Sequence, residues 1–178
     1  MSDTLAPDTK TEAAPADVTV RLADYGYEPD AQAVVTLLDA YARDPMGGGE
    51  PLDDSVRKRL VAALDAFPGA FSLLAFDGED GSEPVGVANC FTGFSTFAAR
   101  PLINIHDLAV LPGQRGRGIG RALMQAVEDE ARARGACKVT LEVLGGNERA
   151  KTLYAALGYA NYALAPEAGT AQFWEKKL

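Results

Sequence analysis

Apolar side chains recur along the chain with two different periods, and each change of period marks a new element. Residues 18–22 alternate between apolar and polar side chains, which predicts a strand. Apolar residues then recur every three or four positions over 29–42 and 53–67, which predicts two helices, the second capped by one of two aspartates at its start. Three apolar runs bounded by turn residues follow and predict three strands. They cover residues 70–76, 84–94 and 102–111.

The second half of the chain alternates between helical and strand patterns. Helical spacing begins near Ile119 and ends at Gly135, a residue typical of the position just past a helix. Residues 138–144 alternate strictly and predict a strand, and a short helix follows between Asn147 and Gly158. The last apolar runs predict a closing hairpin of residues 159–164 and 171–176. The predicted order is strand, two helices, three strands, helix, strand, helix and two strands.

Composition and charge limit the classes of protein. The 178 residues, 47% of them hydrophobic, suit one globular domain over residues 18–178, preceded by a disordered tail over residues 1–17. The net charge of −8 argues against nucleic acid as a partner. We find neither a signal sequence nor a run long enough to cross a bilayer, so we expect a cytoplasmic protein with no membrane partner. The two cysteines, Cys90 and Cys137, lie in apolar runs as expected for buried free thiols, and no metal-ligand spacing is present.

A glycine-rich turn lies between the strand that ends at residue 111 and the helix that follows. Glycines there let the backbone approach an anion, and the free N–H groups of the helix start point toward it. A P-loop would need Lys followed by Ser or Thr after the last glycine, but Arg121 and Ala122 stand there. A dinucleotide loop would need a small residue at position 121. The pattern present is R-x-x-G-x-G, formed by Arg115, Gly118 and Gly120; an ordinary glycine turn with surface arginines is the alternative.

A second motif follows at the spacing of one helix and one strand. It has the form N-x-x-A-x-x-L/F-Y-x-x-x-G-F/Y, and its fixed places are occupied by Asn147, Ala150, Leu153, Tyr154, Gly158 and Tyr159. In this order the two motifs resemble those of the GCN5-related N-acetyltransferases, the GNAT superfamily. The resemblance covers about a third of the chain, residues 102–162. Residues 93–99 and 104–110 are also similar to a narrower bacterial branch of that superfamily.

The resemblance implies a fold and a cofactor. The fold would be α/β (α+β), with a mixed, mostly antiparallel central sheet of six to seven strands, about four flanking helices, and strands that splay around the helix after the glycine turn. The cofactor would be acetyl-CoA, with its pyrophosphate on the glycine turn and its pantetheine arm along the preceding strand. The implied cofactor contacts are Leu108, Ala109, Val110, Arg115, Gly116, Arg117, Gly118, Ile119, Gly120, Arg121, Asn147 and Tyr154.

The resemblance also implies catalytic roles. Tyr154 would be the general acid that protonates the departing thiolate, although a core tyrosine on an apolar helix face fits the pattern too. Residues 141–154 are similar to the bacterial ribosomal-protein N-terminal acetyltransferases, whose glutamate at the place of Glu142 acts as the base. His106 and Asp107 are the alternatives for the base. As neighbours on a strand they point to opposite faces, unless a bulge changes which of them faces the cleft.

The acceptor is expected to be the primary amine of a small molecule or a peptide. The loops near residues 41–52 and 91–100 would hold it, with Tyr41, Asp44, Phe94 and Phe97 as candidate contacts. We allow for assembly into a homodimer. The alternative functions are a non-catalytic acyl-CoA-binding sensor of the same fold and a nucleotide-dependent oxidoreductase with Glu142 on the ribose. A nucleophilic cysteine enzyme is remote, because nothing in the sequence joins a cysteine to His106.

Overall fold

The computed structural model describes residues 18–78, 82–163, 167 and 169–178. Its centre is one sheet with the strand order β1 (Thr19–Leu22), β2 (Ala70–Asp77), β3 (Glu83–Ser95), β4 (Arg100–Val110) and β5 (Val139–Leu141). The first four strands pair antiparallel, and β5 pairs parallel to β4. The predicted mixed, mostly antiparallel sheet is therefore confirmed. The tail predicted for residues 1–17 lies outside the described residues.

The number of strands differs from the prediction of six to seven. Within the described part of the chain the sheet has five strands, and the predicted closing hairpin is represented only by a bridge between Ala163 and Thr170. The chain does reverse there, because the N–H of Ala171 donates to the carbonyl of Tyr162 at 3.0 Å. However, this segment adds no ladder to the outer edge of β5. That strand is three residues long, shorter than the predicted 138–144, so it offers few groups to extend the sheet.

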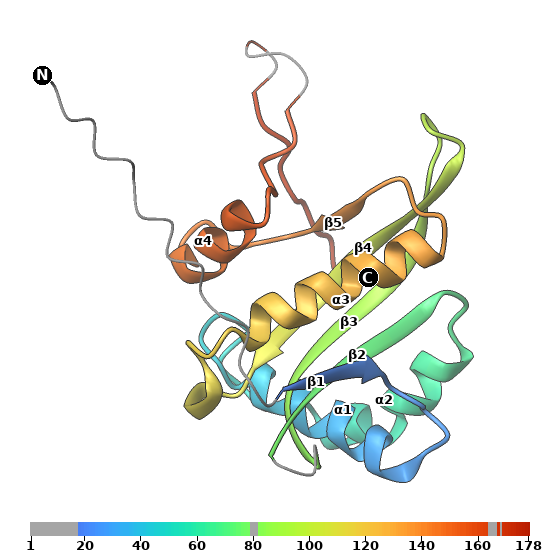
Figure 1. Cartoon of the computed structure of the whole chain (residues 1–178), viewed down its shortest axis with the longest axis vertical. Coiled ribbons are helices and arrows are strands. Elements are labelled where there is room, and N and C mark those ends of the chain that lie inside the picture. Colours follow the sequence, from blue (N-terminus) through green and yellow to red (C-terminus); the bar gives the residue numbers. More distant parts are fainter. Residues whose placement is uncertain (1–17, 79–81, 164–166, 168) are drawn as a thin grey trace, which may run out of the picture.

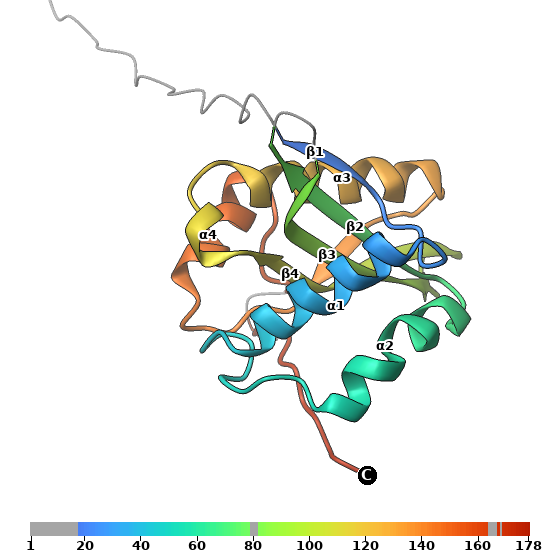
Figure 2. The same cartoon turned by 90° about the horizontal axis from the view of Figure 1, so that it is seen from below.

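In the described part of the chain, four α-helices flank the sheet; Figures 1 and 2 show that they are divided between its two faces. Helices α1 (Glu28–Ala42) and α2 (Asp54–Ala66) pack on one face, where residues such as Leu37 meet Leu74 and Val87. Helices α3 (Ile119–Ala133) and α4 (Glu148–Ala156) pack on the other face, where Leu123 is fully buried. Among the described residues, no helix combines the length and the apolar character needed to cross a membrane.

The predicted helix ends are set by local signals. The carboxylate of Asp53 accepts from the N–H of Ser55 and caps α2, and the side chain of Asn147 accepts from the N–H of Ala150 at 3.2 Å and caps α4. Gly135 follows α3 with a φ of 69°, a left-handed conformation that glycine adopts without a steric penalty. These caps fix where α4 begins and therefore which of its residues face the sheet.

Two irregularities of β4 shape the centre of the molecule. Asn89 pairs with Asp107 but Cys90 pairs with Ile105, so His106 is an extra residue on β4 and forms a β-bulge. The second irregularity lies on the other side of the strand. There β5 pairs only with Ile103–Ile105, whereas β4 continues to Val110. The two parallel strands therefore part beyond Ile105, which is the expected splay.

Candidate functional site

A cleft of about 750 Å³ opens where β4 and β5 part. Its walls are the end of β4, the glycine turn, the start of α3, one side of α4 and the loop after α1. A cleft of this volume is ordinary for a small-molecule or cofactor site. The lining residues are Tyr41, Asp44, Met46, Leu108, Ala109, Val110, Gln114, Arg115, Gly116, Gly118, Ile119, Gly120, Arg121, Gly146, Asn147, Glu148, Arg149, Ala150, Thr152, Leu153, Tyr154 and Ala156.

The glycine turn presents backbone donors to this cleft. Gly116 and Gly118 both have a φ of 81°, in the left-handed region where a side chain would be strained. The first bond of α3 runs from the N–H of Ala122 to the carbonyl of Gly118 at 3.0 Å, so the N–H groups of the preceding turn have no partner within the helix. A Cβ on Gly120 would lie 3.2 Å from the side chain of Leu153 on α4. This turn therefore combines N–H groups that α3 itself does not use with open space beside Gly116, two features that suit the approach of an anion.

The arginines of the turn differ in their surroundings. Arg115 donates from Nε to the carbonyl of Val110 at 2.9 Å and from its terminal nitrogen to Asp44 at 2.7 Å. Arg117 points elsewhere and pairs with Asp77 at the end of β2 and with Gln114. The third, Arg121, lines the cleft itself. Only part of the predicted basic spot therefore faces the cleft directly.

The structure adds a basic residue that we did not predict. Arg149, on the first turn of α4, lines the cleft and lies close enough to Asp44 to lower the pKa of that carboxyl, after the larger effect of Arg115. Its position falls at an unspecified place of the second motif, so the motif carries no signal for it. The helical spacing of residue 149 with Leu153, one turn later, could have placed both side chains on one face.

The predicted pantetheine contacts lie along the open edge of β4. Leu108, Ala109 and Val110 all line the cleft, and they lie beyond the point where β5 pairs with β4. Their backbone groups on that side are thus available to an extended, amide-rich chain. Asn147 lines the cleft opposite them, with its carboxamide oxygen used as the cap of α4. The amide nitrogen of the same side chain can still donate to a ligand.

Tyr154 lies on α4 and lines the inner part of the cleft. Burial raises the pKa of its hydroxyl from 10 to about 12, and the nearby Tyr41 adds to this rise. Tyr41 reaches the cleft from the end of α1, and its own pKa is raised by burial, then by the negative charges of Asp107 and Asp44. Both phenols therefore keep their protons at neutral pH and can donate.

The three candidate bases lie on one side of the sheet but in different surroundings. The ring of His106 meets the ring of Phe91 edge-on at 5.6 Å, and Phe91 belongs to the core under α1 and α2. Asp107 accepts a hydrogen bond from Asn89 at 3.3 Å and lies near Tyr41 of α1. Because of the bulge, the two neighbours do not point to opposite faces as a regular strand would require.

Glu142 follows the last residue of β5 and is exposed. Asn104 on β4 donates to both of its carboxylate oxygens, at 3.2 and 3.3 Å. None of the three candidate bases is among the residues that line the cleft. Asp107 is nevertheless close enough to Tyr41, which lines the cleft, to raise its pKa, and Tyr41 in turn affects Tyr154. Glu142 lies beside Asn104, on the face of the sheet that carries α1 and α2.

The predicted acceptor contacts divide into two groups. Tyr41 and Asp44 line the cleft. Phe94 lies near the end of β3 and Phe97 in the turn that follows; they are 62% and 102% exposed, and neither lines the cleft.

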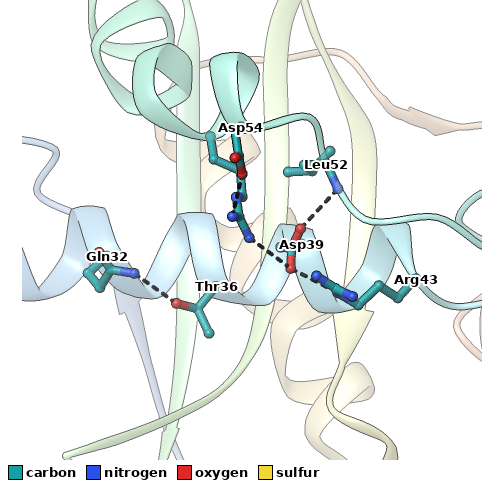
Figure 3. A network of polar contacts seen from close by, with 7 residues as sticks. Gln32, Thr36, Asp39, Arg43, Leu52 and Asp54 are labelled. Carbon is teal, nitrogen blue, oxygen red and sulfur yellow. Dashed lines mark hydrogen bonds and ion pairs between the residues drawn. The ribbon is translucent and has the colours of Figure 1, made fainter.

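A network of polar contacts holds the loop that carries Asp44 (Figure 3). Asp39 of α1 accepts from Arg43 at 2.9 Å and from the N–H of Leu52 at 2.9 Å, and it pairs with Arg57 of α2 at 3.6 Å. Both ends of this loop are therefore attached to α1, with α2 alongside. This attachment limits how far the loop can move away from the cleft.

Comparisons with known proteins agree with this arrangement. Residues 34–159 match the model of the family described as Acetyltransferase (GNAT) family. The chain is 39% identical over 97 residues to streptothricin acetyltransferase of Streptomyces lavendulae, covering 47% of this chain and 51% of that protein. It is 30% identical over 157 residues to mycothiol acetyltransferase of Frankia alni, covering 82% of this chain and 43% of that protein. The chain thus spans about half, or less, of the length of these relatives.

Solved structures share the fold at low sequence identity. An integron cassette protein from the mobile metagenome of V. cholerae superposes with a TM-score of 0.69 at 18% identity, over 89% of this chain and 93% of that one. A ribosomal-protein-alanine N-acetyltransferase from Brucella melitensis superposes with a TM-score of 0.61 at 22% identity, over 83% and 98%.

The family match defines a protein of the acetyltransferase class, and in this structure the glycine turn at the start of α3 lines the cleft. The chain belongs to the GNAT acetyltransferase family.

Proposed function

We propose that this protein is an acetyl-CoA-dependent N-acetyltransferase that moves the acetyl group to a primary amine by direct attack in a ternary complex. The observation that carries the proposal is that the glycine turn at the start of α3, the open edge of β4 and the protonated Tyr154 line one and the same cleft. These are the groups needed for a pyrophosphate, an amide-rich arm and a departing thiolate.

The residues present fit the cofactor. The pyrophosphate of acetyl-CoA would lie on the N–H groups between Gly116 and Arg121, where the helix dipole of α3 also favours a negative charge. The pantetheine amides would pair with the backbone of Leu108–Val110, and the side chain of Asn147 would donate from the opposite wall. Arg121 and Arg149 supply positive charge beside the phosphates.

The residues near the inner end of the cleft fit the chemistry of acetyl transfer. The amine must lose a proton to a base so that its lone pair can attack the thioester carbonyl. The resulting oxyanion would be stabilised by a backbone N–H of β4 in the range Leu108–Val110. When the C–S bond breaks, the thiolate takes the proton of Tyr154, whose raised pKa keeps that proton in place until it is needed.

The base is a choice between the carboxylates near this end. Asp107 lies beside Tyr41, which lines the cleft, whereas Glu142 lies beyond the end of β5. His106 is the remaining candidate, with its ring against Phe91. The acceptor would be a small molecule or a peptide. The names of the relatives point to different acceptors, among them streptothricin and mycothiol, so the comparisons support an amine acceptor without selecting one.

Two measurements test this function. Calorimetry is expected to show binding of coenzyme A and acetyl-CoA, and no binding of NAD under the same conditions. A panel of small amines and peptides, followed by release of free coenzyme A, is then expected to show transfer to at least one acceptor. Binding of NAD without binding of coenzyme A would refute the proposal, and coenzyme A binding without transfer to any amine would favour a non-catalytic sensor.

A further inference from the structure

A line of polar side chains crosses the sheet beneath α1, in a region where apolar residues are expected. Ser72 of β2, Asn89 of β3 and Asp107 of β4 are in register with one another, so the three side chains lie side by side on adjacent strands. Ser72 is 0% exposed and Asn89 is 3% exposed. Their neighbours on the same face, Leu74 and Val87, belong to the hydrophobic core. Burial of a hydroxyl and an amide in a core is unfavourable unless both are hydrogen-bonded, which points to a specific use.

The hydrogen bonds in this line have a single direction. Ser72 donates from Oγ to Oδ1 of Asn89 at 2.7 Å, so the hydroxyl of Tyr25, at 2.8 Å from the same Oγ, is the donor to Ser72. Because Oδ1 of Asn89 accepts from Ser72, its Nδ2 faces the other way. That nitrogen donates to Oδ2 of Asp107 at 3.3 Å. The hydrogen bonds therefore run in one direction, from Tyr25 to Ser72, from Ser72 to Asn89 and from Asn89 to the carboxylate of Asp107.

The bulge at His106 is the second part of this arrangement. If β4 ran through His106 as a regular strand, Asp107 would lie on the same face as Ile105, which is buried in the core under α3. With it, Asp107 turns to the face of Asn89 and of Tyr41, which lines the cleft from α1. The bulge and the buried polar line therefore act on the same carboxylate.

We propose that Asn89, held by Ser72 and Tyr25, is a positioning residue that orients Asp107 as the acceptor of the proton from the attacking amine. This inference rests on the proposed acetyl transfer. In the step, the N–H bond of the ammonium breaks, its proton moves to a carboxylate oxygen of Asp107, and the electron pair stays on nitrogen for the attack on the carbonyl. Oδ2 of Asp107 accepts from Asn89, which leaves the other carboxylate oxygen to take the proton.

The ionisable groups around Asp107 come from three elements. Tyr41 faces it from α1, Cys90 is close enough on β3 to be affected by its charge, and His106 is its neighbour on β4. Burial, and then the charge of Asp107, raises the pKa of Cys90 to about 12, and the pKa of Tyr41 is also raised, so both stay neutral at working pH. A hydrogen bond from a neutral amide favours the charged form of a carboxylate, so removal of the Asn89 amide is expected to destabilise the carboxylate that accepts the proton.

The test is Asn89→Leu, which keeps the branching and the number of side-chain heavy atoms and removes the donor. We expect kcat to fall about tenfold or more, the KM for acetyl-CoA to stay within about twofold, and the acidic limb of kcat/KM to move to higher pH. Ser72→Ala is expected to give the same changes at smaller size, because Asn89 loses only the partner that fixes its orientation. Ser72→Thr, which keeps the hydroxyl, is expected to stay close to the wild type. In an Asp107→Asn background, Asn89→Leu is expected to produce no further shift of the acidic limb.

Asn104→Leu is the matched comparison, since Asn104 makes the same kind of contact with Glu142. If the fall of kcat/KM at low pH shifts in Asn104→Leu but not in Asn89→Leu or Ser72→Ala, this inference is overturned and the base is Glu142. Thermal unfolding of each variant checks that it is folded. If Asn89→Leu does not fold, the comparison of Ser72→Ala with Ser72→Thr tests the positioning role instead. If the wild type binds coenzyme A and transfers acetyl groups while both Asn89→Leu and Ser72→Ala keep its pH profile, the positioning role fails and the proposed function stands. If the wild type does not bind coenzyme A, the proposed function itself fails.

Discussion

Arg115 and Asp44 form an ion pair, 2.7 Å between nitrogen and oxygen, that joins the glycine turn to the loop after α1. The same guanidinium donates to the carbonyl of Val110, the last residue of β4. One side chain therefore connects the strand that would carry the pantetheine arm, the turn that would carry the pyrophosphate, and the loop next to Tyr41. The pKa of Asp44 is lowered by Arg115 first, so the carboxylate stays charged at neutral pH.

We predict that Arg115→Ala weakens the binding of acetyl-CoA by about tenfold, or about 1.4 kcal/mol. The reason is that the turn loses its attachment to Val110 and no longer holds its N–H groups in one geometry. Asp44→Ala breaks the ion pair but leaves the bond to Val110, so its effect on affinity is expected to be under about threefold. Titration calorimetry measures both. Equal effects of the two variants would show that the ion pair, and not the bond to Val110, holds the turn.

A second prediction concerns Gly118, whose φ is 81°. Gly118→Val is expected to place a branched side chain at the turn and to lower the affinity for coenzyme A by about tenfold or more. Gly135→Val is the control, because Gly135 also has a positive φ, of 69°, but lies at the far end of α3 with open space around it. Both variants are expected to lose stability through backbone strain, by about 1–2 kcal/mol. Only the first is expected to lose affinity.

The third prediction assigns the general acid. Tyr154→Phe is expected to lower kcat by about 10²-fold, and high pH is not expected to restore it, because hydroxide cannot supply a proton. Since the pKa of Tyr154 is raised to about 12, the wild-type kcat should show no loss from this group up to about pH 10, where an ordinary tyrosine begins to ionise. Tyr159→Phe serves as the control, because its ring lies 6.2 Å from that of Tyr154 but its hydroxyl has no role in the proposed step. If Tyr154→Phe keeps the wild-type kcat and this kcat does not fall at high pH, Tyr154 is not the general acid.

The fourth prediction separates the candidate bases by their pH response. Asp107→Asn is expected to remove most activity at neutral pH and to recover in part at high pH, where the free amine is abundant without a base. Glu142→Gln is expected to have the smaller effect, because Glu142 is exposed whereas Asp107 is half-buried and held by Asn89. Rate profiles over pH, each with coenzyme A affinity as a control for binding, distinguish the two. The opposite ranking would assign the proton transfer to Glu142.

The fifth prediction concerns stability, at a site away from the cleft. Asp30 is 1% exposed and accepts two hydrogen bonds from Arg21, at 2.5 and 2.7 Å, which together with the N–H of Asp24 hold its pKa below the usual value. Asp30→Asn is expected to reduce the free energy of unfolding at pH 7 by about 2–3 kcal/mol, as for hydrogen bonds to a charged group.

The pH dependence of this loss has a definite sign. A carboxyl whose folded pKa is lowered contributes stability above its unfolded pKa, about 3.9, and loses it as the pH falls through the folded value. The difference between wild type and Asp30→Asn should therefore shrink as the pH is lowered from 4 toward 2. Asp54→Asn is the control, because its ion pair with Arg57 is exposed and should contribute under about 1 kcal/mol. Urea unfolding at several pH values measures both.

The sequence alone determined the features that depend on a few neighbouring residues. The period of apolar side chains set the four helices, and the caps at Asp53 and Asn147 and the stop at Gly135 set three of their ends. The two motifs were sufficient to assign the family, because a glycine turn and a capped helix are local structures whose chemistry lies within about a dozen residues. The outcome agrees with the match over residues 34–159.

Tertiary structure decided what depends on register across the sheet. The pair of Arg115 with Asp44 joins residues 71 positions apart, and the line from Ser72 to Asp107 exists only because three strands pair in one register. Sequence periodicity could not find the bulge at His106, since the run of residues reads as a strand with or without it. With the bulge, every side chain beyond His106 lies on the face opposite to the one that regular alternation predicts. Within the described residues the number of strands also differs from the prediction, because pairing at a sheet edge is a tertiary property. An apolar run near residue 159 shows that a segment can pair, but only the edge offered by β5 decides whether it does.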